Sequence, residues 1–239
     1  MKTELPGGQP AAEKAAYVRG VFTRIAPRYD LMNRLMTGGQ DVTWRRAVIR
    51  RAALPADGRL LDLGAGTGDL AREALRQQPG ARVVAADFTL AMMLAGRASR
   101  RGPDDWSAAD ALRLPYADGS FDAVVSGFLL RNVTDVAGAL AEMLRVLRPG
   151  GRMVALDTTR PTENLLSPFV RFHMRRVIPA LGTLVTGQRD AYTYLPVSSE
   201  KFLAAEELLR RVCAAGFEPA GFERRMFGTV AIHWGQKPG

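Results

Sequence analysis

The chain has 239 residues, 47% hydrophobic and 24% charged, with one cysteine, Cys213. This length and hydrophobic content predict a single α/β domain with a sizeable core, and one cysteine excludes an internal disulfide framework. The net charge of +9 is compatible with nucleic acid, with an anionic membrane or with a merely arginine-rich surface. No stretch is long and apolar enough to predict a membrane-spanning helix, and the Cys213 thiol is expected to be buried.

The N-terminal part of the chain predicts helices that precede the first strand. Residues 1–15 hold Pro, Gly, Gln and Ala without apolar periodicity, which is typical of a mobile start. Residues 16–51 predict helices, with breaks at Ala26-Pro27 and at Gly38-Gly39. One domain is therefore expected over residues 16–239.

A glycine-rich turn follows the first apolar run, residues 60–63. Gly64, Gly66 and Gly68 allow positive φ and let the backbone approach a ligand closely, and the spacing of the next residues predicts a helix. The turn differs from the dinucleotide fingerprint, and a helix that begins at Asp69 would repel a pyrophosphate. The turn therefore predicts a nucleotide-like ligand other than a dinucleotide.

Acidic residues follow the next apolar runs. Asp87 ends the run 82–86, at about the interval of 20 residues from the glycine turn where an acid meets ribose hydroxyls. Asp110 follows the shorter run 106–109, and residues 121–126 predict another buried strand. A lone aspartate is often a helix cap or a loop acid, but the carboxyl ends of parallel strands meet in one crevice. These acids are therefore expected to converge there.

The C-terminal half completes the expected sheet. Residues 134–148 predict a helix, 153–156 a fifth strand, 200–214 another helix, and 217–224 with 228–235 an antiparallel hairpin. The predicted fold is α/β, with a Rossmann-like, seven-stranded, mostly parallel sheet that has one antiparallel edge strand and helices on both faces.

An insertion interrupts this plan at residues 161–197, where a compact connection takes only about 2 to 6 residues. It carries many apolar residues together with Arg171, Arg175 and Arg176. This composition favours a lid that closes over the site and meets a membrane. The alternative is an inserted helix that simply packs on the sheet.

Several motifs resemble a known family. They are Tyr29-Asp30-Leu31-Met32-Asn33, Arg131-Asn132-Val133, Arg145 to Gly151, Tyr192-x-Tyr194 and Gly228 to His233. Together with the glycine turn they resemble the menaquinone and ubiquinone biosynthesis C-methyltransferases, which are class I S-adenosylmethionine-dependent methyltransferases, over roughly residues 18–237.

The resemblance implies S-adenosyl-L-methionine as cofactor. The expected cofactor-binding residues are Asp62, Gly64, Gly66, Thr67, Asp87, Phe88, Asp110, Ala111 and Gly127. Arg131 and Asn132 are the expected catalytic residues, which would orient the acceptor hydroxyl or a water and stabilise a developing phenolate; a structural cap is the alternative. The expected substrate-binding residues are Tyr29, Asp30, Asn33, Tyr192 and Tyr194, of which the last two could equally be core aromatics. The general base stays unassigned.

The implied reaction is C-methylation of demethylmenaquinol to menaquinol. A benzoquinol on the ubiquinone path or another small acceptor is the alternative, and an RNA methyltransferase is a remote one that only the basic pI supports. The expected partners are a polyprenylated quinol and, transiently, an anionic membrane surface. The enzyme is expected in the cytoplasm, at the inner face of the cell membrane. A homodimer and a monomer are both compatible with the sequence. No metal is expected, because His173 and His233 are the only histidines and no metal-ligand spacing occurs. No nucleic acid is expected either, because residues 1–50 hold no recognisable RNA-binding module or aromatic-basic motif.

The sequence departs from the family pattern at several positions. Asp41 stands where the family has His, Thr37 replaces Ser, and Asp157 with Thr159 replace Glu and Ser. Gly127 stands where some members present Ser to the cofactor. An aspartate would not titrate as a histidine does at the same pH, so Asp41 is assigned no catalytic role.

Overall fold

The computed structural model describes residues 11–98, 102–103, 105–160, 176–177, 198–199 and 202–239. Its strands are β1 (Arg59–Leu63), β2 (Arg82–Asp87), β3 (Asp105–Ala108), β4 (Phe121–Gly127), β5 (Leu147–Thr158), β6 (Ala220–Arg225) and β7 (Val230–Gln236). They form one sheet in the order β3-β2-β1-β4-β5-β7-β6. The first five strands are parallel, and β7 runs antiparallel to both β5 and β6. The predicted mixed sheet is confirmed, with β7 as the reversed strand and β6 outermost.

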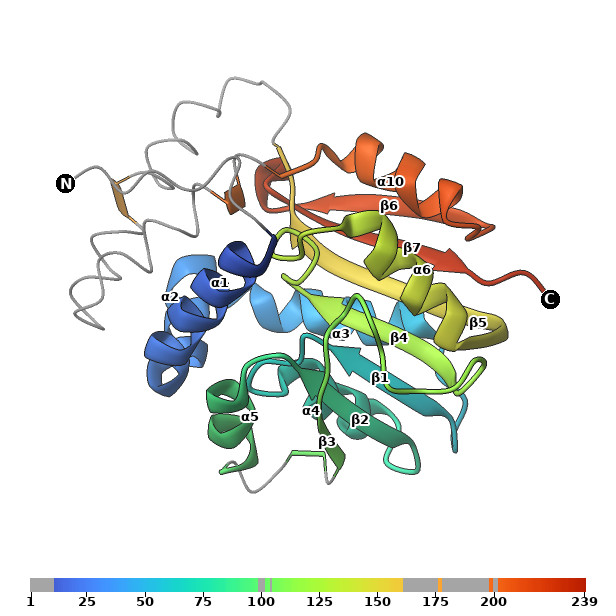
Figure 1. Ribbon diagram of the computed structural model, residues 1–239, viewed down its shortest axis with the longest axis horizontal. Coiled ribbons are helices and arrows are strands. Elements are labelled where there is room, and N and C mark those ends of the chain that lie inside the picture. The colour runs from blue at the N-terminus through green and yellow to red at the C-terminus, as the bar shows by residue number, and fades with distance from the viewer. Residues whose placement is uncertain (1–10, 99–101, 104, 161–175, 178–197, 200–201) are drawn as a thin grey trace.

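Helices cover both faces of the sheet. They are α1 (Ala11–Ile25), η1 (Ala26–Arg28), α2 (Tyr29–Thr37), α3 (Asp41–Ala52), α4 (Asp69–Gln77), α5 (Leu90–Arg97), α6 (Val136–Val146), α10 (Ala205–Ala214) and η3 (Met226–Gly228). In Figure 1, α6 and α10 lie in front of the sheet and α3 and α4 behind it, while α1 and α2 stand at one end. The predicted helix breaks are confirmed at η1 and at residues 38–40, but α1 begins at Ala11, earlier than expected.

Three separate apolar clusters hold these layers together. Phe121, Met143 and Phe217 are buried in the cluster under α6 and α10, and the opposite cluster lies under α3 and α4. The third cluster is small and joins Val21 of α1 to Met32 of α2. The N-terminal helices therefore form a unit beside the sheet rather than part of its core.

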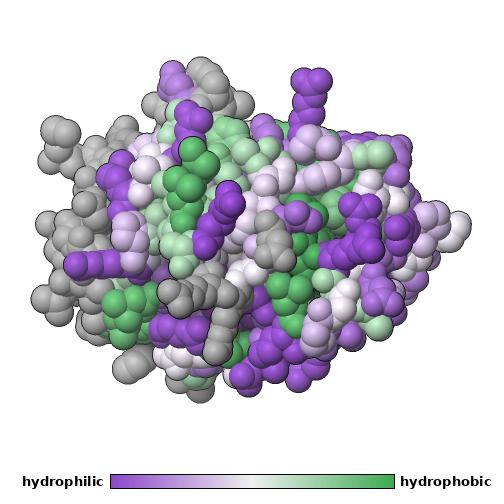
Figure 2. All heavy atoms as spheres, turned by 90° about the horizontal axis from the view of Figure 1, so that it is seen from below, coloured by the Kyte–Doolittle hydropathy of each residue, from purple (hydrophilic) through white to green (hydrophobic). Residues whose placement is uncertain are grey.

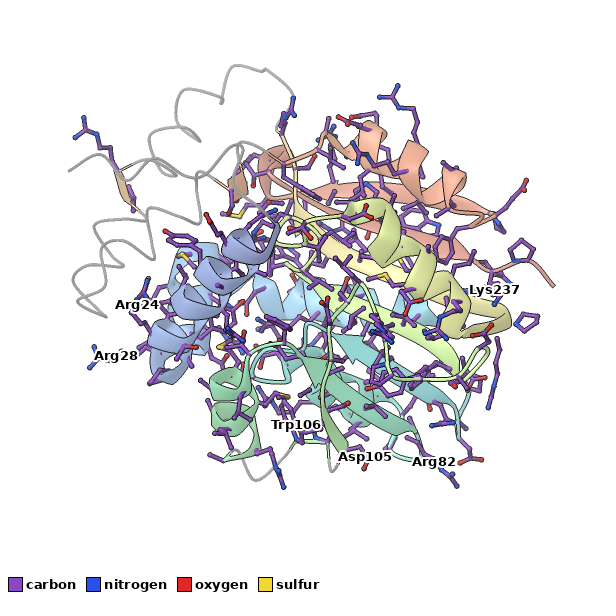
Figure 3. The ribbon with its side chains drawn as sticks, viewed as in Figure 1. Arg24, Arg28, Arg82, Asp105, Trp106 and Lys237 are labelled. Carbon is purple, nitrogen blue, oxygen red and sulfur yellow. The ribbon has the colours of Figure 1, made fainter. Side chains whose placement is uncertain are left out.

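The glycine turn is fixed by close packing behind it. A Cβ on Gly96 of α5 would lie 2.5 Å from the carbonyl oxygen of Thr67 and would also collide with the ring of Trp106. Trp106 comes from β3 (Figure 3), and its indole nitrogen donates a hydrogen bond of 2.9 Å to the carbonyl of Pro103. Only glycine lets α5 approach the turn this closely.

Some expectations about the C-terminal half need correction. The Cys213 thiol is exposed on α10, so its expected burial is wrong: the residue faces away from the buried side of that helix, which carries Leu208 and Val212. Strand β5 begins at Leu147 rather than near Met153, because its first residues pair with β4 before a register irregularity. The β6–β7 hairpin is confirmed. Most of the 161–197 insertion lies outside the described residues.

Candidate functional site

The carboxyl ends of the parallel strands border a cavity whose empty volume is about 910 Å³, part of it open to solvent. Its lining includes Gly64 and Gly66 after β1, Asp87 and Phe88 after β2, Asp110 and Ala111 after β3, and Gly127 and Asn132 after β4. A smaller cavity shares Tyr29, Gly64, Gly66 and Gly127 with it and is bordered by Asp62 and Thr67. The structure therefore brings the predicted cofactor residues together.

Asp87 links the end of β2 to the glycine turn. Its Oδ2 accepts a hydrogen bond of 2.7 Å from the Gly66 amide, and its Oδ1 accepts one of 2.6 Å from the Thr89 amide. Burial raises the pKa of this carboxyl, while the amide hydrogen bonds act in the opposite direction. Asp87 thus shapes the turn and presents its carboxylate to the cavity.

Asp62 is a buried acid with one unsatisfied oxygen. Its side chain is on β1, the residue is 1% exposed, and Oδ2 accepts a hydrogen bond of 2.9 Å from the Ala71 amide. Oδ1 has no hydrogen-bond partner among the described residues. Burial raises the pKa of Asp62 to about 7. A cationic or hydrogen-bond-donating ligand group in the smaller cavity would satisfy this oxygen.

Gly64 and Gly127 border both cavities at positions where a side chain would press on neighbouring residues. Gly64 has a φ of +69°, and a Cβ there would lie 2.9 Å from Cδ1 of Leu129. A Cβ on Gly127 would lie 3.3 Å from Cδ1 of Leu70. Larger residues at either position would narrow both cavities, since Gly64 and Gly127 border each of them.

Helix α1 contributes a wall that the sequence patterns did not predict. Val18, Arg19 and Phe22 line the larger cavity, and the Arg19 guanidinium lies 5.4 Å from the ring centroid of Phe88. Nζ of Lys14 donates a hydrogen bond of 2.7 Å to the carbonyl of Val133, which ties α1 to the segment after β4. The apolar members have the spacing of an ordinary helix core, so they gave no separate signal.

The segment after β3 brings Asp110 and Ala111 to the larger cavity. Asp110 is exposed, and its Oδ1 accepts a hydrogen bond of 2.9 Å from the Leu112 amide, while Ala111 is buried. Both line the larger cavity. The carboxylate therefore caps the turn after β3 and keeps other acceptor positions for a ligand.

Helix α2 supplies the predicted acceptor-side residues. Tyr29 borders both cavities, and burial raises its pKa. Asp30 accepts a hydrogen bond of 2.6 Å from the Thr67 hydroxyl, which anchors α2 on the glycine turn. Asn33 is buried, and its Nδ2 has no partner among the described residues. Tyr192 and Tyr194 lie outside the described residues.

Asp41 belongs to a buried group of ion pairs. Its Oδ2 lies 2.6 Å from Nη1 of Arg45, which also lies 2.6 Å from Oδ2 of Asp69 at the start of α4. The hydroxyl of Thr37 donates a hydrogen bond of 3.1 Å to Asp41. Asp41 borders neither cavity and joins α2, α3 and α4 through these contacts.

Arg131 and Asn132 take different positions although they are adjacent. Nη1 of Arg131 lies 2.9 Å from Oδ1 of Asp157, and both side chains are buried. Arg131 lines neither cavity. Asn132 lines the larger cavity, and its Nδ2 donates a hydrogen bond of 2.9 Å to the carbonyl of Phe128. Of the two predicted catalytic residues, only Asn132 reaches the cavity wall.

The described part of the chain holds no group of three His, Cys, Asp or Glu side chains that could bind a metal ion. Nε2 of His233 lies 2.9 Å from the carbonyl oxygen of Ala205, and the residue is buried. His233 is therefore a hydrogen-bonded core residue of β7, as predicted. His173 lies outside the described residues.

The glycine turn after β1, the acid at the end of β2 and the strand order define the Rossmann-like fold of methyltransferases. Solved structures agree on the fold. The [4+2]-cyclase SpnF has a TM-score of 0.68 and 20% identity, with 94% of this chain and 97% of that chain covered. Phospholethanolamine N-methyltransferase 2 of Haemonchus contortus, solved with S-adenosylhomocysteine, has a TM-score of 0.59 and 16% identity, with 82% and 53% covered.

Sequence comparison gives the family. The model of the ubiE/COQ5 methyltransferase family matches residues 11–237, and the chain belongs to this family. It is 46% identical to a ubiquinone/menaquinone biosynthesis C-methyltransferase UbiE of Desulfotalea psychrophila, over 94% of this chain and 92% of that protein. It is also 46% identical to a demethylmenaquinone methyltransferase of Thermus thermophilus, over 91% of this chain and 100% of that protein. The predicted resemblance is confirmed, and the chain is a methyltransferase.

Proposed function

We propose that this enzyme transfers a methyl group from S-adenosylmethionine to a ring carbon of demethylmenaquinol and so forms menaquinol. The observation that carries the proposal is the 46% identity, over nearly the whole of both chains, to a protein named demethylmenaquinone methyltransferase. The two cavities, which share lining residues, supply a site of suitable chemistry, with acids for a ribose and apolar walls for rings.

The residues of the site fit the cofactor. The unsatisfied Oδ1 of Asp62 would accept a hydrogen bond from the ammonium of the methionine part in the smaller cavity. Gly64 and Gly66 border the same cavity and present no side chain to it, and Asp87 would accept hydrogen bonds from the ribose hydroxyls. Phe88 and Ala111 would flank the adenine in the larger cavity.

When bound, S-adenosylmethionine supplies a methyl group on a sulfonium. In the overall reaction a carbon–carbon bond forms, the sulfur–methyl bond breaks and the ring carbon loses a proton. The protein gains most by aligning the reactants and excluding water, because the sulfonium charge disappears as the transition state forms. Asn132 and Tyr29 are the polar side chains of the larger cavity that we assign to orient the quinol hydroxyl. Tyr29 acts there as a neutral phenol, since burial raises its pKa.

A benzoquinol of the ubiquinone path is the second candidate acceptor. It is favoured by the relative of equal identity whose name covers both pathways. The test is methyl transfer from labelled S-adenosylmethionine to short-tailed demethylmenaquinol and, in parallel, to the matching demethyl benzoquinol. Faster transfer to the naphthoquinol supports the proposal, and transfer to the benzoquinol alone replaces it. Absence of transfer to both refutes both candidates.

We also infer that the enzyme works in the cytoplasm at the inner face of the membrane, where its polyprenylated substrate resides. Arg24 and Arg28 point away from the body of the molecule on α1 and η1, and such charges attract anionic lipid (Figure 3). Leu90 and Leu94 of α5 are 63% and 56% exposed. Figure 2 shows the lower face, on which apolar patches lie among hydrophilic side chains. In the described part of the chain no helix is long and apolar enough to cross a membrane.

A further inference from the structure

The loop after β4 is fastened to the end of β5 by one buried acid, Asp157. The parallel register places Gly127 opposite Leu156, so the loop after β4 begins beside Asp157, which is still paired with Ala231 of β7. Oδ1 of Asp157 accepts hydrogen bonds from Nη1 of Arg131 at 2.9 Å and from the Thr158 amide at 2.8 Å. Its Oδ2 accepts one of 3.2 Å from the Arg131 amide. The carboxylate therefore holds Arg131 by both its side chain and its main chain.

The same loop has an unfavourable backbone that needs such support. Phe128 has a φ of +59°, in the left-handed region that non-glycine residues rarely adopt. Its amide donates a hydrogen bond of 2.7 Å to the carbonyl of Leu156, and the Arg131 guanidinium lies 4.8 Å from the centroid of its ring. The main-chain hydrogen bond and the contact with the Arg131 guanidinium thus both act on Phe128.

This loop carries Asn132 to the cavity. The Asn132 amide donates a hydrogen bond of 2.8 Å to the carbonyl of Leu129, and its side-chain amide donates one to the carbonyl of Phe128. The orientation of Asn132 therefore depends on the conformation of the whole loop. The side chain of Arg131, which belongs to the same loop, is buried: 6% of it is exposed, and 2% of the side chain of Asp157 is exposed.

We propose that Asp157 is a positioning residue for methyl transfer: through its buried pairing with Arg131 it fixes the loop that places Asn132 against the acceptor. The inference rests on the proposed function, in which Asn132 faces the quinol. The proposal gives Arg131 the same indirect role. Its guanidinium is paired with Asp157 and lines neither cavity, so it does not reach a quinol ring bound there. Two buried charges in contact also resist separation, which keeps the loop in one conformation.

The test compares Asp157→Asn, Asn132→Ala and the double variant with the wild type. Steady-state kcat and KM are measured with short-tailed demethylmenaquinol, S-adenosylhomocysteine affinity by calorimetry, and Tm by thermal unfolding. Asp157→Asn is expected to lower kcat about 10- to 100-fold, as a displaced polar group does, with cofactor affinity nearly unchanged. In the Asn132→Ala background, Asp157→Asn should lower kcat no further, because its effect passes through Asn132.

Asp122→Asn is the matched control at the opposite end of the sheet. Asp122 likewise binds a guanidinium, Nη1 of Arg148 at 2.7 Å, and a backbone amide, that of Arg59 at 2.7 Å. It touches neither cavity, so this variant should retain the wild-type kcat even where its Tm falls. Loss of kcat in step with Tm in both variants would reduce Asp157 to a structural residue and overturn the proposal.

Other outcomes are equally decisive. An unchanged kcat in folded Asp157→Asn overturns the proposal, and so does a multiplicative loss in the double variant, which would mean that Arg131 or Asp157 acts on the acceptor directly. If Asp157→Asn lowers the folded fraction, Arg131→Lys replaces it, since lysine keeps the buried charge but not the planar guanidinium. Asp157→Glu should recover part of kcat because it restores the ion pair. Wild-type inactivity on both quinols refutes the proposed function instead.

Discussion

Replacement of Asp62 by Asn should change how the free energy of unfolding depends on pH. Burial raises the pKa of Asp62 from 3.8 to about 7, so the folded protein binds its proton more tightly than the unfolded chain does. Stability from this group is therefore present at low pH and is lost as pH rises toward the folded pKa. At about 1.4 kcal/mol per pKa unit, this group changes the free energy of unfolding by about 4 kcal/mol in total. About 3 kcal/mol of that change falls between pH 5 and pH 8.

The assay is urea denaturation of the ligand-free wild type and of Asp62→Asn at pH 5 and pH 8. The variant keeps an acceptor for the Ala71 amide but has no proton to lose. From pH 5 to pH 8 its free energy of unfolding should therefore rise by about 3 kcal/mol relative to that of the wild type. Asp57→Asn, which changes an exposed aspartate before β1, should follow the wild type. A constant difference between wild type and Asp62→Asn across this range would refute the reasoning.

Three further predictions concern the cofactor, the packing and the membrane. Asp87→Ala should weaken S-adenosylmethionine binding by about 1.5 to 3 kcal/mol in calorimetry, because hydrogen bonds to a charged group are lost; unchanged affinity would remove Asp87 from the site. Gly96→Ala should lower the free energy of unfolding by about 1 to 3 kcal/mol in urea, since its Cβ meets Thr67 and Trp106, and wild-type stability would contradict this packing. Neutralising Arg171, Arg175 and Arg176 together should weaken binding to anionic vesicles by about 1 kcal/mol per residue at low salt, with activity on a soluble quinol retained; equal binding would exclude this segment from the membrane contact.

The strand-end acids were predictable from sequence because a parallel sheet sends its carboxyl ends to one edge. Asp87 closes an apolar run and Asp110 follows one, and the structure brings both to the larger cavity. The helix breaks before β1 were equally clear, since Pro27 and the paired glycines at 38 and 39 leave the chain few alternatives.

Other parts of the site depend on contacts between distant segments. Arg131 was assigned to the acceptor because it follows β4, yet its partner Asp157 is set by the register of β4 with β5, which no local pattern encodes. The wall formed by α1 was missed for a related reason. Val18 and Phe22 have ordinary helical spacing, and only the docking of α1 beside the strand ends turns one of its faces toward the cavity.

The separate apolar cluster of α1 and α2 has a consequence for hydrogen exchange. Because Val21, Ile25 and Met32 pack apart from both clusters of the sheet, these helices can open while the sheet stays intact. Their amide protons should therefore exchange with solvent deuterium much faster than those of the central strand β4. A ligand bound between α1 and the strand ends would stabilise the closed state of these helices. Binding should therefore be detectable as slower deuterium uptake in α1.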